Sequence, residues 1–252
     1  MRIEKPSGTQ IPQLLKLWKA AFGEHGGFWE LFLETAFSPE RCRCILEADT
    51  VEAALCWFDT ECAGQKMAYI YAVVTDSARR GQGLCRTLLA DTHRHLAQQG
   101  YQAALLVPAE ESLRAMYRKL GYETCTAVTE FSCAAAQTTV SLEAIGPDAY
   151  AGLRRELLPE GGVLQEGSGL NFLAHQAQFY RGKNFLMAAY TQEDTLHAME
   201  LLGDPAAAPA ITAALRCSRG EFRTPGQDKP FAMWHPLTPD AGQPEYFGFA
   251  FD

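Results

Sequence analysis

The chain has 252 residues, of which 47% are hydrophobic, and this is enough for one or two globular domains with buried cores. No stretch approaches the roughly 18 consecutive apolar residues of a membrane-spanning helix, and the N-terminal residues lack a signal peptide's apolar segment. The formal net charge of −8 argues against nucleic acid or an anionic membrane as a partner. We therefore expect a cytoplasmic protein, in which a local basic patch could still bind a polyanionic small molecule.

The eight cysteines are scattered, without the CxxC spacing of zinc sites or the density of a disulfide scaffold. We expect mostly reduced, buried thiols and no metal. Cys42 and Cys44 point to the same face of a predicted strand, which leaves a metal or redox role open. His93 and His95 lie two residues apart on a predicted helix and cannot share a face, so they do not predict a paired metal site.

Apolar periodicity predicts alternating strands and helices through residue 132. A short strand at Ile3 precedes a helix of residues 11–22, whose apolar residues recur at helical spacing. Gly26 and Gly27 separate this helix from an aromatic helix that begins at Phe28. The remaining predicted elements are a hairpin of residues 41–48 and 51–60, strands at 66–75, 103–107 and 122–132, and helices at 84–100 and 110–120. This order is typical of a mixed α/β fold.

Residues 69–85, YIYAVVTDSARRGQGLC, run from a β-branched strand through a polar turn into a basic, glycine-bearing loop that opens a helix. Unpaired amides and the helix dipole converge at such a position and can hold a phosphate. The loop is not a Walker loop, because no GxxxxGK[ST] occurs in the chain. It is not a dinucleotide fingerprint either, because Arg86 stands in place of the third glycine or alanine.

The segment that remains, Arg80-Gly81-Gln82-Gly83-Leu84-Cys85, resembles the acyl-CoA loop of the GNAT N-acyltransferase superfamily. That family's pattern is Arg or Gln, two residues, Gly, one residue, then Gly or Ala. Arg80 and Gly83 match it, whereas Cys85 departs from it but is small and keeps its backbone donor. The downstream segment LRAMYRKLGYE also resembles the family, and the resemblance covers about half the chain. It implies a GNAT-like central, mixed but mostly antiparallel sheet flanked by helices.

The resemblance implies that acetyl-CoA is the acyl donor and that it is bound without a metal. Its pyrophosphate would lie on the amides of residues 80–85, with charge-assisted bonds from Arg79, Arg80 or Arg86. The strand before the loop would pair with the pantetheine arm, and an amide near Val74 would stabilise the oxyanion of the thioester. The residues expected to bind the donor are Val73, Val74, Thr75, Arg80, Gly81, Gln82, Gly83, Leu84, Cys85 and Arg86.

Tyr117 is the candidate acid that protonates the departing thiolate while an amine attacks the thioester directly, although its hydroxyl could instead be satisfied by packing. Cys85 lies at a helix N-terminus beside arginines, so its thiol could have a lowered pKa and relay the acyl group, or it could simply fill space. No general base stands out among the nearby candidates, which are Glu30, Glu34, Glu110, Glu111 and Tyr71.

The aromatic helix that begins at Phe28 is apolar on nearly every side, so it either is deeply buried or lines a pocket. Phe28, Trp29, Phe32 and, on the strand, Tyr71 are therefore candidates for the acceptor pocket as well as for the core.

A joint at CAAAQ divides the chain into a domain of residues 1–135 and a second of 136–252. Beyond it the pattern predicts a strand at 140–142, helices at 147–158 and 206–215, and strands at 184–191, 194–202, 221–224, 231–234 and 246–251. Gly161-Gly162, the aromatic run of residues 172–180 and the hairpin after Lys183 echo the first half. We therefore expect a degenerate second copy in tandem, with a different small α/β module as the alternative.

In this second copy, Gly203-Asp204-Pro205 stands where the glycine loop should be. Proline removes a donor and the aspartate adds negative charge, so we expect no coenzyme A binding there.

These patterns predict an acetyl-CoA-dependent N-acetyltransferase whose acceptor is a primary amine of a small molecule, a protein or a peptide. The alternative is a non-catalytic acyl-CoA-binding sensor or assembly module that keeps the loop without turnover. The sequence leaves the acceptor, the acyl chain and an oligomeric state open.

Overall fold

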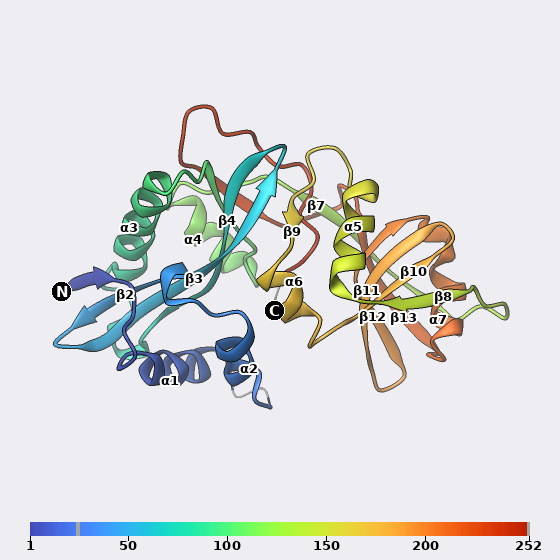
Figure 1. Ribbon diagram of the computed structural model, residues 1–252, viewed down its shortest axis with the longest axis horizontal. Helices are drawn as coiled ribbons and strands as arrows, with labels where there is room; N and C mark the ends of the chain where they lie inside the picture. Colours follow the sequence, from blue (N-terminus) through green and yellow to red (C-terminus); the bar gives the residue numbers. More distant parts are fainter. Residues whose placement is uncertain (24–25, 251–252) are drawn as a thin grey trace.

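The computed structural model describes residues 1–23 and 26–250, which form two sheets with helices packed on their faces (Figure 1). The first sheet has the order β1-β2-β3-β4-β5-β15-β6, with β9 beside β3. Its strands are β1 (Arg2–Glu4), β2 (Cys42–Glu47), β3 (Thr50–Cys62), β4 (Gln65–Thr75), β5 (Ala103–Leu106), β6 (Glu123–Thr124), β9 (Leu164–Gln165) and β15 (Met233–Pro236).

The second sheet has the order β14-β7-β13-β12-β11-β10-β8. Its strands are β7 (Ala127–Ala134), β8 (Leu142–Ile145), β10 (Gln178–Gly182), β11 (Phe185–Gln192), β12 (Thr195–Gly203), β13 (Arg219–Pro225) and β14 (Lys229–Pro230). Among the described strands, β4 pairs with β5 and β12 with β13 in parallel, and the other pairs are antiparallel. The predicted mixed α/β fold with mostly antiparallel sheets is confirmed.

Both faces of the first sheet are buried, because side chains alternate along each strand. Phe58 of β3 lies in the core under α1 (Ile11–Phe22) and α2 (Phe28–Thr35). Its neighbour Trp57 lies on the opposite face, under α3 (Leu84–Gln98) and α4 (Glu111–Arg118). These helices begin close to the residues at which the sequence predicts them.

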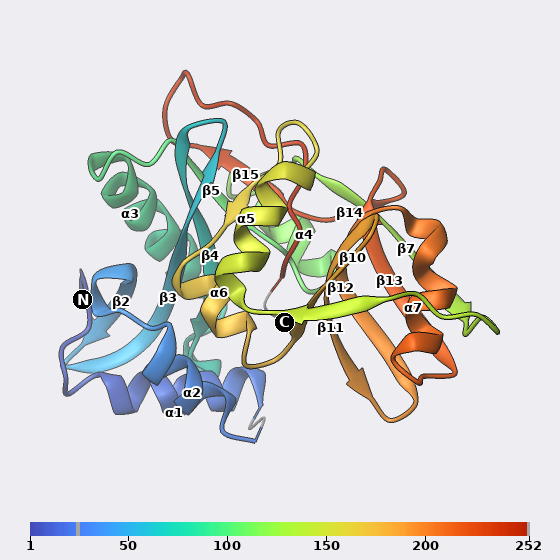
Figure 2. The same ribbon diagram turned by 45° about the vertical axis from the view of Figure 1, so that its right-hand side comes forward.

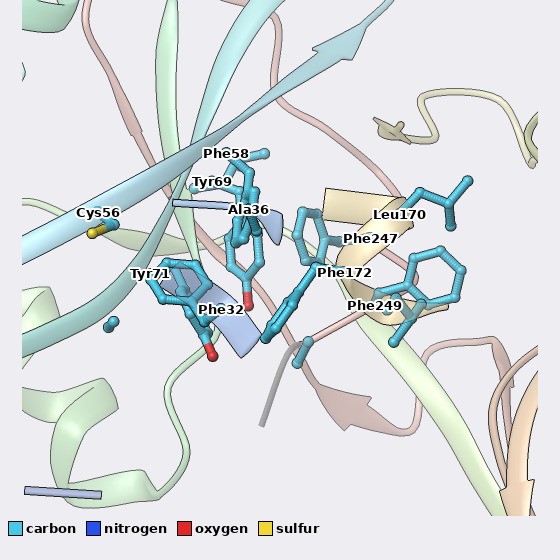
Figure 3. Close-up of a cluster of buried hydrophobic side chains, with 14 of the residues drawn as sticks. Phe32, Ala36, Cys56, Phe58, Tyr69, Tyr71, Leu170, Phe172, Phe247 and Phe249 are labelled. Atoms are coloured by element: carbon cyan, nitrogen blue, oxygen red, sulfur yellow. The ribbon is translucent and has the colours of Figure 1, made fainter. Parts of the chain in front are cut away.

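The second sheet is covered by α5 (Pro147–Leu157) and α6 (Ser168–Leu173) on one face and by α7 (Ala208–Ala214) on the other. In both views α6 lies between the two sheets (Figures 1 and 2). One buried cluster therefore spans both halves of the chain. Its aromatic rings contact each other across the halves, with centroids 5.4 Å apart for Phe32 and Phe172 and 4.9 Å apart for Tyr69 and Phe247 (Figure 3).

The two sheets exchange strands. The sequence predicts a single strand over residues 122–132, whereas the structure has β6 in the first sheet and β7 in the second, antiparallel to β13. The place beside β5 is taken by β15, from near the end of the chain. The sequence-based division at residue 135 stays a prediction, and the chain crosses from one sheet to the other on both sides of it.

The second sheet repeats the order of the first. In each, three consecutive antiparallel strands are followed by a parallel neighbour, β5 in the first sheet and β13 in the second. In each sheet, the last antiparallel pair before this parallel neighbour contains a register shift. It lies in the pairing of β3 with β4 at Leu55, and in the pairing of β11 with β12 next to Ala189. These shared irregularities support the expected tandem copy.

Further predicted elements differ from the structure. The predicted strand of residues 140–142 shares only Leu142 with β8, and that of residues 231–234 shares only residues 233–234 with β15. The run of residues 172–180, expected to echo the aromatic helix, begins in α6 and ends in β10. The predicted strand of residues 246–251 is irregular through residue 250, apart from a bridge between Tyr246 and Gly162, and residue 251 lies outside the described residues. A side chain replaces the missing strand partner, because the Gln165 amide binds both the carbonyl and the amide of Phe249, at 2.9 and 3.0 Å.

Candidate active site

A bulge in β4 opens the first sheet. Ala72 has a φ of 51°, which is strained for a residue with a side chain, and the Trp18 indole donates a hydrogen bond to its carbonyl at 3.3 Å. The pairing of β4 with β5 covers 67–69 against 103–105 only. Beyond Tyr69, β4 therefore has a backbone edge without a strand partner among the described residues, and a cleft opens beside it.

The cleft is a cavity of about 790 Å³ that runs from the edge of β4 along the glycine loop to α4. Val73, Val74 and Thr75 line its strand side. Gly81 and Gly83 have φ values of 77° and 80°, in the left-handed region that glycine favours, and a Cβ atom built on either meets no atom within 4 Å. The loop therefore presents backbone, rather than side chains, to open space.

The amides of residues 81–86 lie at the N-terminus of α3. The first backbone hydrogen bond of this helix runs from the Thr87 amide to the Gly83 carbonyl at 3.0 Å. Within the described ranges, no backbone carbonyl accepts a hydrogen bond from the amides of residues 81–86. These donors and the positive end of a 15-residue helix form an anion-binding position.

The arginines of the loop have different roles. Arg79 pairs with Glu47 at 2.6 Å and Glu52 at 3.6 Å, and the hydrogen bond to Glu47 raises its pKa. It therefore ties the loop to β2 and β3. Arg80 and Arg86 are exposed and line the cavity. Nε of Arg80 donates to the Thr75 carbonyl at 3.4 Å, which leaves its terminal nitrogens available to an anionic ligand. Gln82 is exposed and accepts a hydrogen bond from Arg79 at 3.3 Å, which fixes the turn rather than the cavity wall.

Tyr117 of α4 lies where this cleft meets a second cavity, and it lines both. Its side chain is 7% exposed, and burial, together with the nearby Cys85, raises the pKa of the phenol. The hydroxyl therefore keeps its proton at neutral pH. Arg114, one turn earlier, fixes the helix by donating to the carbonyls of Pro230 and Phe231 at 3.1 and 3.0 Å.

The glycine loop at a helix N-terminus is the feature that the resemblance implied, and the structure adds a bulge in β4 and a parallel neighbour that pairs with β4 over three residues. A family model described as an acetyltransferase (GNAT) domain matches residues 2–125. The N-terminal half of the chain belongs to the GNAT acetyltransferase family.

Solved structures extend the likeness in fold over nearly the whole chain. A GCN5-related N-acetyltransferase from Anabaena variabilis has a TM-score of 0.74 at 17% identity, covering 94% of this chain and 73% of that one. One from Kribbella flavida has a TM-score of 0.70 at 19% identity, covering 92% and 70%. A tandem GNAT protein from the clavulanic acid biosynthesis pathway has a TM-score of 0.54 at 11% identity, covering 95% and 99%. No curated protein sequence matches the chain.

The second cavity, of about 460 Å³, lies between α2, β4 and the segment after β5. Of the predicted acceptor residues, Phe28, Trp29 and Tyr71 line it. Phe32 does not, because it is 1% exposed and packs between Trp18 and Phe172 in the buried cluster that spans both halves of the chain.

Sequence reasoning missed several residues of this cavity, among them Phe22, Tyr69, Leu113 and Gln176. Helical spacing places Phe22 on the apolar face of α1, so it could have been included. Gln176 lies in the second half, between α6 and β10, and no local pattern connects it with the GNAT domain.

Cys85 is half-buried, and burial raises the pKa of its thiol. The prediction that this thiol has a lowered pKa, as an acyl relay would need, is therefore wrong, because burial disfavours the charged thiolate. The thiol packs against the core beneath the loop, which agrees with the space-filling alternative.

The four candidate glutamate bases do not line the smaller cavity, and three of them make ion pairs or hydrogen bonds. Glu30 pairs with Lys19 at 2.5 Å, which lowers its pKa. Glu110 lines the cleft and accepts a hydrogen bond from Ser112, and Glu111 pairs with Arg114 at 3.3 Å. Glu34 is exposed on α2. Tyr71 is the candidate that lines the smaller cavity.

No group of three or more metal-ligating side chains is found among residues 1–23 and 26–250. The sulfur atoms of Cys42 and Cys44 lie 3.9 Å apart, as the shared strand face predicts, and burial raises the pKa of Cys42 strongly. His95 contacts Trp57, whereas His93 lies on the other side of α3, so the two histidines do not share a site. No helix in the described part of the chain is long and apolar enough to cross a membrane.

In the second half, the loop after β12 differs from the glycine loop. Asp204 caps the next turn by accepting from the amide of Ala206 at 3.0 Å, and Pro205 lacks a donor. α7, which follows it, has seven residues, against the fifteen of α3.

His93 gives the GNAT domain a dependence of stability on pH. It shares a hydrogen bond of 2.8 Å with the Tyr122 hydroxyl and stacks on His235, and burial, then the charge of His235, lower its pKa from 6.5 to about 3. The unfolded chain binds this proton more readily, so the free energy of unfolding should fall as pH drops from 6.5 towards 3, by up to about 1.4 kcal/mol per pH unit.

Urea unfolding at a series of pH values measures this slope. In His93→Gln the change in the free energy of unfolding with pH, between pH 6 and about 4, should be smaller than in the unmodified protein by up to about 1.4 kcal/mol per pH unit. Equal slopes would exclude His93 as the source.

Proposed function

We propose that the protein is an acetyl-CoA-dependent N-acetyltransferase that transfers the acetyl group to a primary amine by direct attack. The observation that carries the proposal is the position of Tyr117, which lines both the cleft beside the glycine loop and the smaller aromatic cavity and whose raised pKa keeps the phenol protonated. An acyl donor in the cleft and an amine acceptor in the smaller cavity would meet at this side chain.

The cleft suits acetyl-CoA in its shape and its donors. The amides at the start of α3 can hold the pyrophosphate, and the exposed Arg80 and Arg86 add charge-assisted bonds. The unpaired edge of β4 offers backbone groups to the amides of the pantetheine arm. A backbone amide near Val74 would then stabilise the oxyanion as it forms.

In the reaction, the amine nitrogen attacks the thioester carbonyl, so a C–N bond forms and the C–S bond breaks. The departing thiolate takes the proton of the Tyr117 hydroxyl, and the amine's own proton passes to water or to a second group. Tyr117 then regains a proton from solvent. Because its pKa is raised, the phenolate formed in this step is a strong base and is reprotonated readily.

The proposal is tested by incubating the pure protein with acetyl-CoA and a panel of primary amines while free thiol is followed. Amine-dependent thiol release, with the acetylated amine identified by mass, supports an enzyme. Tight acetyl-CoA binding without thiol release for any amine would favour the alternative, an acyl-CoA-binding sensor or assembly module.

Arg80→Ala should weaken acetyl-CoA binding about tenfold, because one exposed charge-assisted contact to phosphate is lost. Arg94→Ala is the matched control, since Arg94 is exposed near the other end of α3 and pairs with Asp91 at 3.3 Å. Isothermal titration with coenzyme A measures both. If the two variants bind equally well, Arg80 does not contact the donor.

A further inference from the structure

The smaller cavity identifies a class of acceptor. We propose that the acceptor is an aromatic monoamine, and that the side-chain amide of Gln176 selects it by donating a hydrogen bond to a polar group on its body. This inference rests on the proposed function and specifies the substrate of the same site.

The walls of the cavity favour an aromatic body. Phe22, Phe28 and Trp29 come from α1 and α2, and Tyr71 comes from β4. The rings of Phe28 and Trp29 meet edge to face, with centroids 5.0 Å apart, and aromatic rings prefer such edge-to-face or offset contacts with one another. Its volume of about 460 Å³ falls within the range of roughly 300–1,000 Å³ found for sites of small organic ligands.

Charge argues against polycationic acceptors. Among the described residues that line the cavity, none carries a charged side chain. Aromatic faces can accept a single ammonium group, but a second or third positive charge would be buried without a partner. Polyamines, aminosugars with several amines, and lysine side chains of basic peptides are therefore disfavoured.

Gln176 supplies the polar recognition. It lines the cavity from the second half of the chain, and its Nε2 is buried without a hydrogen-bond partner in the described structure. Such an orphaned donor is costly, and turning the amide toward a ligand oxygen in the cavity relieves that cost. Trp29 is not available for this, because its indole N–H donates to the Gly23 carbonyl at 3.1 Å.

Thiol release is measured with phenylethylamine, tyramine, phenylalaninamide, spermidine and a lysine peptide. We expect kcat/KM for the best aromatic amine to exceed that for spermidine and for the peptide by at least about a hundredfold. Equal or faster turnover of spermidine or the peptide would overturn the acceptor class while leaving the acetyltransferase proposal intact. No thiol release with any amine, although acetyl-CoA binds, would instead overturn both.

Gln176→Leu tests the recognition residue. It should lower kcat/KM about tenfold for tyramine or phenylalaninamide, which carry a polar group, and leave phenylethylamine within about twofold. Gln178→Leu, an exposed change two residues away and outside the cavity, should leave all three unchanged. If Gln176→Leu affects the polar amines no more than phenylethylamine, Gln176 does not select the acceptor.

Discussion

Replacing Tyr117 with phenylalanine should lower kcat by roughly 100- to 10,000-fold, the range that a positioned general acid contributes. The change removes only the hydroxyl, so the ring still packs against Tyr122, whose centroid lies 5.7 Å away. The affinity for acetyl-CoA should change less than threefold, because the donor is held by the loop and the edge of β4. Steady-state kinetics and coenzyme A titration measure the two quantities separately.

Tyr190→Phe is the matched control for this prediction. Tyr190 is 39% exposed on β11, far along the sequence from the cleft, and it stacks on His197. Its loss of a hydroxyl should leave kcat within about twofold. Unchanged kcat in Tyr117→Phe would remove the tyrosine from the mechanism and leave water as the proton donor.

The residues around the cleft that we propose for the donor could be predicted from sequence because they are contiguous. Residues 73–86 contain a strand, a turn, two glycines and a helix start, and each of these has a local signal. The structure brings them around one cavity, with Tyr117 of α4 on its other wall. What spacing alone could not give is the difference between Arg79, which is paired with Glu47, and the exposed Arg80.

The lining of the smaller cavity, which we propose for the acceptor, could be predicted only in part, because it depends on tertiary packing. An apolar helix does not reveal which of its rings face a cavity, and here Phe28 lines it while Phe32 is in the core. Gln176 approaches from the second half, which no local pattern predicts. The exchange of β7 and β15 between the sheets could not be predicted for the same reason. Strand propensity predicts a strand, but not the sheet in which it pairs.

A buried hydrogen-bond network in the second half contacts the wall of the smaller cavity through Phe247. Glu200 of β12 is fully buried and accepts hydrogen bonds from Arg154 at 2.8 and 3.0 Å and from the hydroxyls of Tyr150 and Tyr246 at 2.7 and 2.9 Å. Tyr246 is followed by Phe247, whose ring packs on Tyr69 in the cavity wall. The carboxylate therefore fixes the segment that joins the second sheet to the wall of the smaller cavity.

Glu200→Gln should lower the free energy of unfolding by about 3–5 kcal/mol, because it leaves the buried Arg154 guanidinium without its counter-charge. Urea denaturation followed by tryptophan fluorescence measures the loss. Glu221→Gln is the matched control, since Glu221 on neighbouring β13 lies near the surface, where it contacts Arg219 at 3.0 Å and His197 at 3.2 Å. The substitution should lower the free energy of unfolding by less than about 1 kcal/mol.

At temperatures where Glu200→Gln remains folded, its affinity for coenzyme A should equal that of the unmodified protein, because the glycine loop lies in the first half. Its KM for the amine should rise, because Phe247 loses its anchor beside Tyr69. An equal loss of stability in the two glutamate variants would show that the network contributes no more than a surface ion pair. An unchanged amine KM in a destabilised Glu200→Gln protein would show that the acceptor cavity is held by the aromatic core alone.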